Sequence, residues 1–89
     1  MADEDALESA KNIDAALAGD LRSVGVHDLR ELRAVGAAEA WDRLFRADLR
    51  DSLDTRLALE GAVAGRRWIR LDPDVRERCA EHVRRRRVG

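Results

Sequence analysis

The segment from Ser52 to Trp68, SLDTRLALEGAVAGRRW, constrains the fold of this chain more than any other part of its sequence. One helical face within it recurs every four residues: Leu53, Leu57, Gly61 and Gly65. A glycine inside a helix costs about 1 kcal/mol relative to alanine, so Gly61 requires a compensating contact. We expect another element to lie against this bare backbone. The helix would then be the central rod of the fold, with Trp68 as an anchor at its end.

Four further segments show apolar residues at helical spacing. The expected helices cover residues 13–24, 29–35, 37–46 and 73–86, besides the one that Ser52 or Asp51 would cap. No segment alternates with period two, which argues against a sheet. The sequence therefore predicts an all-α protein, a compact bundle of about five short helices of the helix-hairpin-helix or SAM-domain kind.

Turn residues fall between these segments. Gly25 is expected to end the first helix in the left-handed conformation, and Gly36 to end the second. Asp28 precedes the second helix as an N-cap with a glutamate three residues on, and Asp72-Pro73 begins the last helix. These caps and turn glycines favour short helices joined by tight turns.

We expect residues 1–89 to form one domain, with 1–6 and 86–89 frayed. Aromatic residues make up only 3% of the chain, so Trp41, Phe45 and Trp68 are the first choices for the core. On the last helix a narrow apolar stripe is expected to dock: Val75, Cys79 and Val83. Charged residues such as Asp42 are expected to face water.

The charges are nearly balanced overall but separated along the chain. Charged residues are 39% of the sequence and the formal net charge is −1, which argues against a general nucleic-acid or membrane binder. Residues 1–20 hold six acids and one base, a charge of −5, whereas residues 66–89 hold nine arginines and four acids, a charge of +5. This arrangement suits helix dipoles and solubility. Alternatively, seven arginines could form one anion or DNA contact patch at one end of the molecule: Arg66, Arg67, Arg70, Arg84, Arg85, Arg86 and Arg87.

No catalytic constellation is visible in the sequence. The single cysteine, Cys79, cannot form an internal disulfide, and we interpret it as a packed thiol. His27 and His82 have no partner at metal-ligand spacing, so we expect neither metal, cofactor nor small-molecule substrate. Glu60 has apolar neighbours and is expected to pair with an arginine, with Arg56, Arg66 and Arg67 the possible partners. The start lacks a signal peptide and no run could span a bilayer, so a soluble cytoplasmic protein without a membrane role is expected.

Three blocks of the sequence resemble the C-terminal domain of TfoX (Sxy), a bacterial regulator of natural competence for DNA uptake. They are VGVHDLRELRAVGAAEAW (24–41), SLDTRLALEGAVAGRRW (52–68) and LDPDVRERC (71–79), of which the second is the most specific. The resemblance implies a compact helical domain, here in a stand-alone version, and no enzyme. Structural positions alone carry over: Gly25, Asp28, Gly36, Trp41, Glu60, Gly61, Gly65 and Trp68. One departure is Asn12-Ile13-Asp14, where the family often has an Ile-Gly-Pro type turn.

Two functions follow as hypotheses. The first is a non-enzymatic helical interaction module, acting in regulation through a protein partner or self-association. The second is a helix-hairpin-helix-like DNA-binding accessory domain, suggested by Gly25 and Gly36 at helix junctions and by the arginine-rich end. The carboxylate of Asp14 opposes the second, because it would repel a phosphate at that turn.

Overall fold

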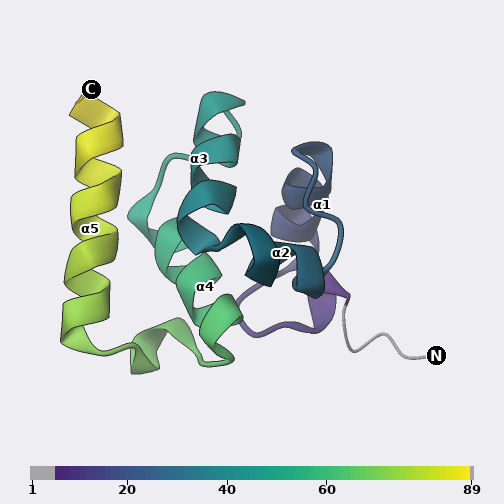
Figure 1. The fold of residues 1–89 in the computed structure, drawn as a ribbon, viewed down its shortest axis with the longest axis horizontal. Helices are drawn as coiled ribbons and strands as arrows, with labels where there is room; N and C mark the ends of the chain where they lie inside the picture. The colour runs from purple at the N-terminus through teal and green to yellow at the C-terminus, as the bar shows by residue number, and fades with distance from the viewer. Residues whose placement is uncertain (1–5, 89) are drawn as a thin grey trace.

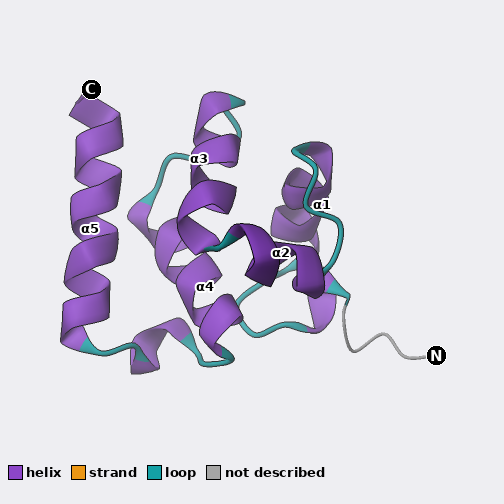
Figure 2. Cartoon of the chain, in the orientation of Figure 1, coloured by secondary structure: helices purple, strands orange, loops and turns teal. Residues whose placement is uncertain are grey.

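The computed structural model describes residues 6–88, and every regular element within them is a helix (Figures 1 and 2). The elements are the 3₁₀ turn η2 (Leu7–Ser9), α1 (Ala15–Ser23), α2 (Leu29–Val35), α3 (Ala37–Arg46), α4 (Leu53–Ala64), the 3₁₀ turn η3 (Trp68–Arg70) and α5 (Pro73–Val88). The predicted all-α fold of five short helices is confirmed. The second and third helices have the predicted bounds, whereas the first begins two residues later than expected.

The C-terminal helix is longer than the sequence suggested. It continues to Val88, and Arg86 in its last turns forms two hydrogen bonds with Asp42 of α3, at 2.9 and 3.1 Å. Residues 86–88, which were expected to fray, are helical in the structure, and this ion pair joins the end of α5 to α3. Residues 1–5 and 89, also expected to fray, lie outside the described residues.

Side-chain caps start three of the helices. Asp14 accepts a hydrogen bond from the amide of Leu17, Asp28 from Glu31, and Ser52 from Thr55, at 2.9, 2.8 and 3.2 Å. Each cap satisfies one of the backbone donors that a helix leaves free at its N-terminus. The predicted cap at Asp28 is confirmed, and Ser52 rather than Asp51 caps α4.

Left-handed glycines end α1 and α4. Gly25 has φ +90° and Gly65 has φ +73°. After α1, the amide of Val26 donates to the carbonyl of Leu21 and that of Gly25 to the carbonyl of Arg22, which is the Schellman pattern. Gly65 ends α4 with the same two kinds of bond, one of them from the amide of Arg66 to the carbonyl of Gly61 at 2.8 Å.

Helix α4 is the central rod of the fold. It contacts α2, α3, α5 and η3, and in Figure 1 it lies between α5 on one side and the α1–α2 region on the other. Its residues are buried on several faces, among them Leu57, Leu59 and Ala62. A helix surrounded by others must be apolar or small on most of its surface, which explains its composition.

Gly61 makes the close contact that its position required. A Cβ placed there would come within 2.5 Å of Nδ2 of Asn12 and 2.6 Å of the carbonyl oxygen of Arg66. The groups that approach are the side-chain amide of Asn12, from the segment before α1, and a backbone carbonyl of the turn after α4. Glycine is thus required by packing at this point of the helix.

Two of the three aromatic rings predicted for the core lie in it. Trp41 is fully buried, and Phe45 is half-buried and stacks on it with ring centroids 5.1 Å apart. Trp68 is 39% exposed, so its prediction as a core residue is wrong. The chain turns outward after Gly65, and the guanidinium of Arg76 lies over the indole of Trp68 at 5.6 Å. The buried residue of this loop is Leu71.

The docking stripe of α5 is confirmed. Cys79 and Val83 are buried, and Val75 is half-buried. Cys79 joins Leu57 and Leu71 in a small second core, while Val83 reaches the main one. The last helix is therefore attached mainly along α4.

Candidate interaction surface

The five residues 66–70, RRWIR, form an exposed turn between α4 and α5, and we call them the RRWIR turn. Trp68 is 39% exposed and Ile69 57% exposed, so two large apolar side chains lie next to each other on the surface. Scattered exposed apolar residues are normal on soluble proteins, but adjacent ones among arginines are typical of contact sites.

Asn12 holds the RRWIR turn in place. Its Nδ2 donates to the carbonyl of Arg66 at 2.8 Å, and its Oδ1 accepts from the amide of Trp68 at 3.2 Å. A longer contact of 3.5 Å joins the same amide group to the carbonyl of Ala58. Because Asn12 has φ +74°, a conformation that asparagine tolerates better than most residues, its side chain can reach the turn. The turn is thus fixed by a residue more than 50 positions earlier in the chain.

Four cations gather beside the turn. Lys11, Arg66, Arg67 and Arg70 line a shallow depression of about 350 Å³. None of them forms an ion pair with any residue in the described part of the chain. Unpaired cations around one hollow favour a carboxylate or phosphate ligand.

The neighbouring depression has a mixed character. Its lining includes Asp14 and Asp54 together with Arg50, Arg67 and the ring of Trp68, and Asn12 contributes to it as well. The excess of positive charge is therefore confined to the Lys11 side of the turn. An acidic ligand would be attracted on the Lys11 side, whereas the charges of the other depression balance.

The seven arginines of the predicted patch do not come together. Arg66, Arg67 and Arg70 precede α5, whereas the other four occupy its last turns, and a 16-residue helix is about 24 Å long. In Figure 1 the turn lies at one end of α5 and the C-terminus at the other. The single basic patch is therefore wrong, because a straight helix separates its two halves.

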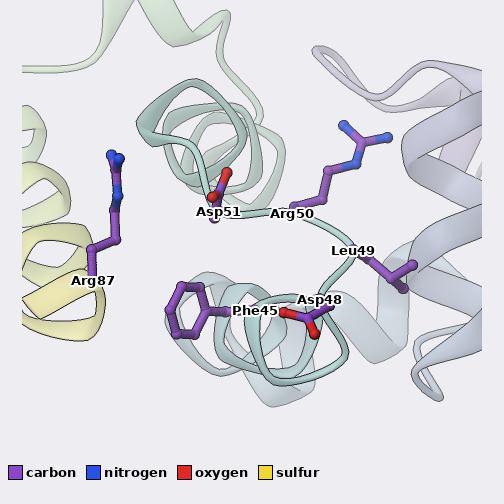
Figure 3. A pocket seen from close by; sticks show the side chains of 6 residues that line it. All are labelled: Phe45, Asp48, Leu49, Arg50, Asp51 and Arg87. Atoms are coloured by element: carbon purple, nitrogen blue, oxygen red, sulfur yellow. The ribbon is translucent and has the colours of Figure 1, made fainter. Parts of the chain in front are cut away.

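The C-terminal arginines are largely engaged by this chain. Arg84 and Arg85 both pair with Glu81, and Arg86 pairs with Asp42. Arg87 faces a depression of about 430 Å³ (Figure 3), which is lined by Phe45, Asp48, Leu49, Arg50, Asp51 and Arg87. Both signs of charge line this hollow, and Arg50 is bound to Asp20 at 2.7 Å. It offers no excess of one charge to a ligand.

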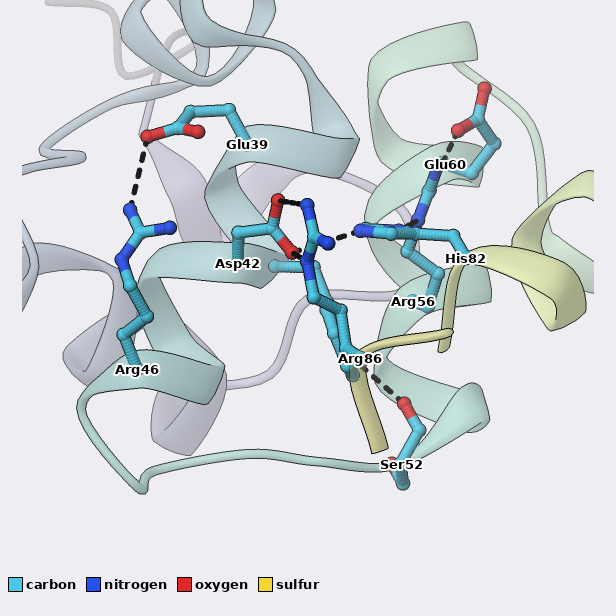
Figure 4. Close-up of polar contacts among 9 residues, drawn as sticks. Glu39, Asp42, Arg46, Ser52, Arg56, Glu60, His82 and Arg86 are labelled. Atoms are coloured by element: carbon cyan, nitrogen blue, oxygen red, sulfur yellow. Dashed lines mark hydrogen bonds and ion pairs between the residues drawn. The ribbon is translucent and has the colours of Figure 1, made fainter. Parts of the chain in front are cut away.

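A chain of polar contacts joins α4, α5 and α3 (Figure 4). Glu60 accepts from Nη1 of Arg56 at 2.8 Å, and Nε of Arg56 donates to Nδ1 of His82 at 2.8 Å. The other ring nitrogen of His82 lies 2.8 Å from Oδ1 of Asp42, which also binds Arg86. The predicted pairing of Glu60 with an arginine is confirmed, and the partner is Arg56. We call these five residues the polar chain.

The polar chain fixes the tautomer of His82 and lowers the pKa of Asp42. Because Nδ1 of His82 accepts from Arg56, the proton of the neutral ring is on Nε2, which donates to Asp42. Burial by itself raises the pKa of Asp42, but the hydrogen bonds from Arg86 and His82 together outweigh it, so the pKa is lowered. Asp42 is 7% exposed, so the expectation that it faces water is wrong. Its partners on α5 explain why a carboxylate can be buried here.

The cysteine and the other histidine are also buried or hydrogen-bonded. Cys79 is 1% exposed, and burial raises the pKa of its thiol, which opposes a nucleophilic role. His27 contacts Glu31 through Nδ1 at 2.9 Å. Within residues 6–88, no group of three or more histidine, cysteine, aspartate or glutamate residues could hold a metal ion. No helix of this part is both long and apolar enough to span a bilayer.

The glycine turn after α1 has no free amides. Gly25 and Val26 donate to carbonyls of α1, and the amide of His27 donates to the carboxylate of Glu31 at 2.7 Å. A helix-hairpin-helix turn would direct such amides at a phosphate. Here they are used within the protein, and a carboxylate lies beside them. The second glycine junction, at Gly36, has φ +88° and donates its amide to Leu32.

The geometry defines a small all-helical domain with one exposed basic and apolar turn. The sequence matches the TfoX C-terminal domain family over residues 3–83, and the chain belongs to this family. No curated protein matches it.

Two crystal structures share the fold. One, of an uncharacterised protein from Listeria monocytogenes in a triclinic form, is 35% identical with a TM-score of 0.81 and covers 83% of this chain and 84% of that one. The other, of a protein of unknown function from the same organism in a tetragonal form, is 34% identical with a TM-score of 0.82. It covers 85% of this chain and 94% of that one.

Proposed function

We propose that this chain is a non-enzymatic interaction module that binds another macromolecule through the RRWIR turn. The observation that carries the proposal is the exposed pair Trp68 and Ile69 beside cations that have no ion pair within the described part. Tryptophan and arginine are the residues most enriched at the energetic centres of protein interfaces. Asn12 fixes the backbone of the turn, so little backbone entropy is lost on binding.

The burial of the thiol and the hydrogen bonds of His82 support a non-catalytic role. Cys79 is buried, and His82 is held between Arg56 and Asp42. A general base needs access to a substrate proton, and a nucleophile needs an adjacent base. These side chains instead join helices to one another.

The DNA-binding alternative has one observation in its favour, the cations around Lys11. The helix-hairpin-helix version of it has weaker support, because the Gly25 turn uses its amides internally and faces Glu31. A fluorescence anisotropy titration with duplex DNA at low salt tests it. Saturable binding that falls steeply with salt would favour this alternative over the protein-interaction module.

Capture from the native host tests the main proposal. Tagged wild-type protein and the double variant Trp68→Ser/Ile69→Ser are purified in parallel, and the bound proteins are identified by mass spectrometry. Leu49→Ser is the matched control, because Leu49 is 40% exposed but lies on a different loop. We expect a partner that is retained by wild type and the control and lost with the double variant. Identical partners for all three would place the binding surface elsewhere.

A further inference from the structure

The partner of the RRWIR turn can be named by chemical class, an inference that rests on the function proposed above. We propose that the turn binds an acidic protein segment that also presents an aliphatic or aromatic side chain. The acidic groups would occupy the depression lined by Lys11, Arg66, Arg67 and Arg70, and the apolar group would cover Trp68 and Ile69.

The cations favour an anionic partner. All four line one hollow, and none has a carboxylate partner among the described residues. Arginine forms paired hydrogen bonds with carboxylates as well as with phosphates, so charge alone does not separate a protein from a nucleic acid. The apolar residues make that distinction.

Ile69 favours a protein. A nucleic-acid strand presents phosphates, sugars and base faces, and an aliphatic side chain at 57% exposure gains little from them. Trp68, with Arg76 over its ring at 5.6 Å, could contact either a base or a protein side chain, so Ile69 makes the distinction. An apolar side chain of a protein segment would remove both Trp68 and Ile69 from water, a gain proportional to the buried apolar area.

The flanking carboxylates also oppose a long uniform polyanion. Asp14 and Asp54 line the depression next to the turn together with Arg50 and Arg67, so this depression has no excess of positive charge. Duplex DNA carries about one negative charge for every 1.7 Å of its axis, so a strand that continued past Asn12 would bring phosphates near these carboxylates. A protein segment can limit its acidic residues to the Lys11 side.

Part of the acidic surface of a second copy is not available to these cations. The described acidic residues of its N-terminal part are already engaged: Glu8 pairs with Arg22, Asp14 caps α1 and Asp20 pairs with Arg50. The hydrogen bonds from Arg22 lower the pKa of Glu8 to about 2, as expected for a committed carboxylate. These three carboxylates are therefore not available to the cations of another copy.

Three probes of equal charge test the proposal on the full chain. They are a short peptide of glutamate and leucine, the same peptide with serine in place of leucine, and an oligothymidylate. Trp68 emission reports binding, and amide chemical shifts show where each probe lies. We expect the glutamate–leucine peptide to bind saturably and about tenfold more tightly than either other probe, with the largest shifts at Lys11 and in the RRWIR turn.

Charge variants locate the site. Arg66→Ser/Arg70→Ser should weaken binding of the glutamate–leucine peptide about tenfold, whereas Arg33→Ser/Arg78→Ser, which removes two exposed arginines from other helices, should leave it nearly unchanged. Equal losses in the two variants would contradict a defined site.

Several results would overturn the proposal. Tighter binding of oligothymidylate would assign the surface to nucleic acid. Concentration-dependent dimers in light scattering that Trp68→Ser abolishes would assign it to a second copy. If the glutamate–leucine peptide fails to bind while a partner is still captured through Trp68 and Ile69, this inference fails and the proposed function stands. If the capture is also independent of the turn, both fail.

Discussion

The side-chain amide of Asn12 lies directly over Gly61, so that a Cβ on Gly61 would come within 2.5 Å of its Nδ2. The same amide donates to the carbonyl of Arg66. One polar side chain therefore joins the segment before α1, the bare face of α4 and the turn that follows it. This contact connects the packing of the domain to the geometry of its exposed surface.

Gly61→Ala should destabilise the protein by about 1–3 kcal/mol, because the new methyl group must displace Asn12 or the backbone of Arg66. Gly19→Ala is the matched control, since Gly19 lies in α1 with no atom within 4 Å of the added Cβ. That change should stabilise by about 0.5–1 kcal/mol through helix propensity. Urea unfolding measures both. Similar effects of the two changes would contradict the close approach over Gly61.

Asn12→Gly should destabilise the protein by about 1–3 kcal/mol while preserving the positive φ of residue 12. A specific readout is the amide of Trp68, whose acceptor is Oδ1 of Asn12. Its hydrogen exchange should accelerate in the variant. The amide of Val26, which donates to Leu21 in a distant turn, is the control. Its hydrogen-exchange rate should rise only as much as the lower stability of the whole protein requires. Unchanged exchange at Trp68 would count against the bond.

Asp42→Asn should cost about 1–3 kcal/mol at neutral pH, because it breaks the ion pair with Arg86 and the contact with His82. The pKa of Asp42 is lowered from 3.8 in the fold. Its contribution to stability is therefore present above about pH 3.8 and lost as the pH falls through the lower folded value.

Thermal unfolding at a series of pH values checks this pH dependence. Wild type should lose more stability on acidification than Asp42→Asn. Asp51→Asn, on an exposed loop residue, should retain the wild-type acid response. An identical acid response in wild type and Asp42→Asn would exclude a stabilising role for this carboxylate.

The two tryptophans should differ in both stability and fluorescence. Trp41→Ala should cost about 3–5 kcal/mol, as expected for a fully buried ring. Trp68→Ala should cost about 1–2 kcal/mol, because the ring is partly exposed and its contact with Arg76 is at the surface. Iodide should quench emission strongly in wild type and weakly in Trp68→Phe. Equal iodide quenching in these two proteins would mean that Trp68 is buried.

The helices could be predicted because their signals are local. Asp28 and Ser52 cap helices, and Gly25 ends one, through bonds to residues within a few positions. The helical cost of Gly61 likewise indicated a close contact. What the sequence could not identify was Asn12 as the group that makes it, since that depends on residues far apart in the chain.

The errors at Trp68 and Asp42 have a common cause. Residue type predicts burial only on average: large rings are mostly inside and carboxylates mostly outside. Asp42 is buried because Arg86 and His82 meet it from α5, and Trp68 is exposed because the turn after Gly65 leads away from the core. The surface that we propose for binding arises from the second of these exceptions. The tryptophan–isoleucine pair flanked by arginines was the sequence signal for it.

The bond between Asn12 and the RRWIR turn also affects when the surface can exist. Its two halves flank α1 to α4 in the sequence, so the bond exists only where the fold brings them together. A nascent or N-terminally clipped chain would lack the clamp and leave residues 66–70 unshaped. The proposed partner would then bind only the folded domain, because the binding surface depends on a contact between the two ends of the helical core.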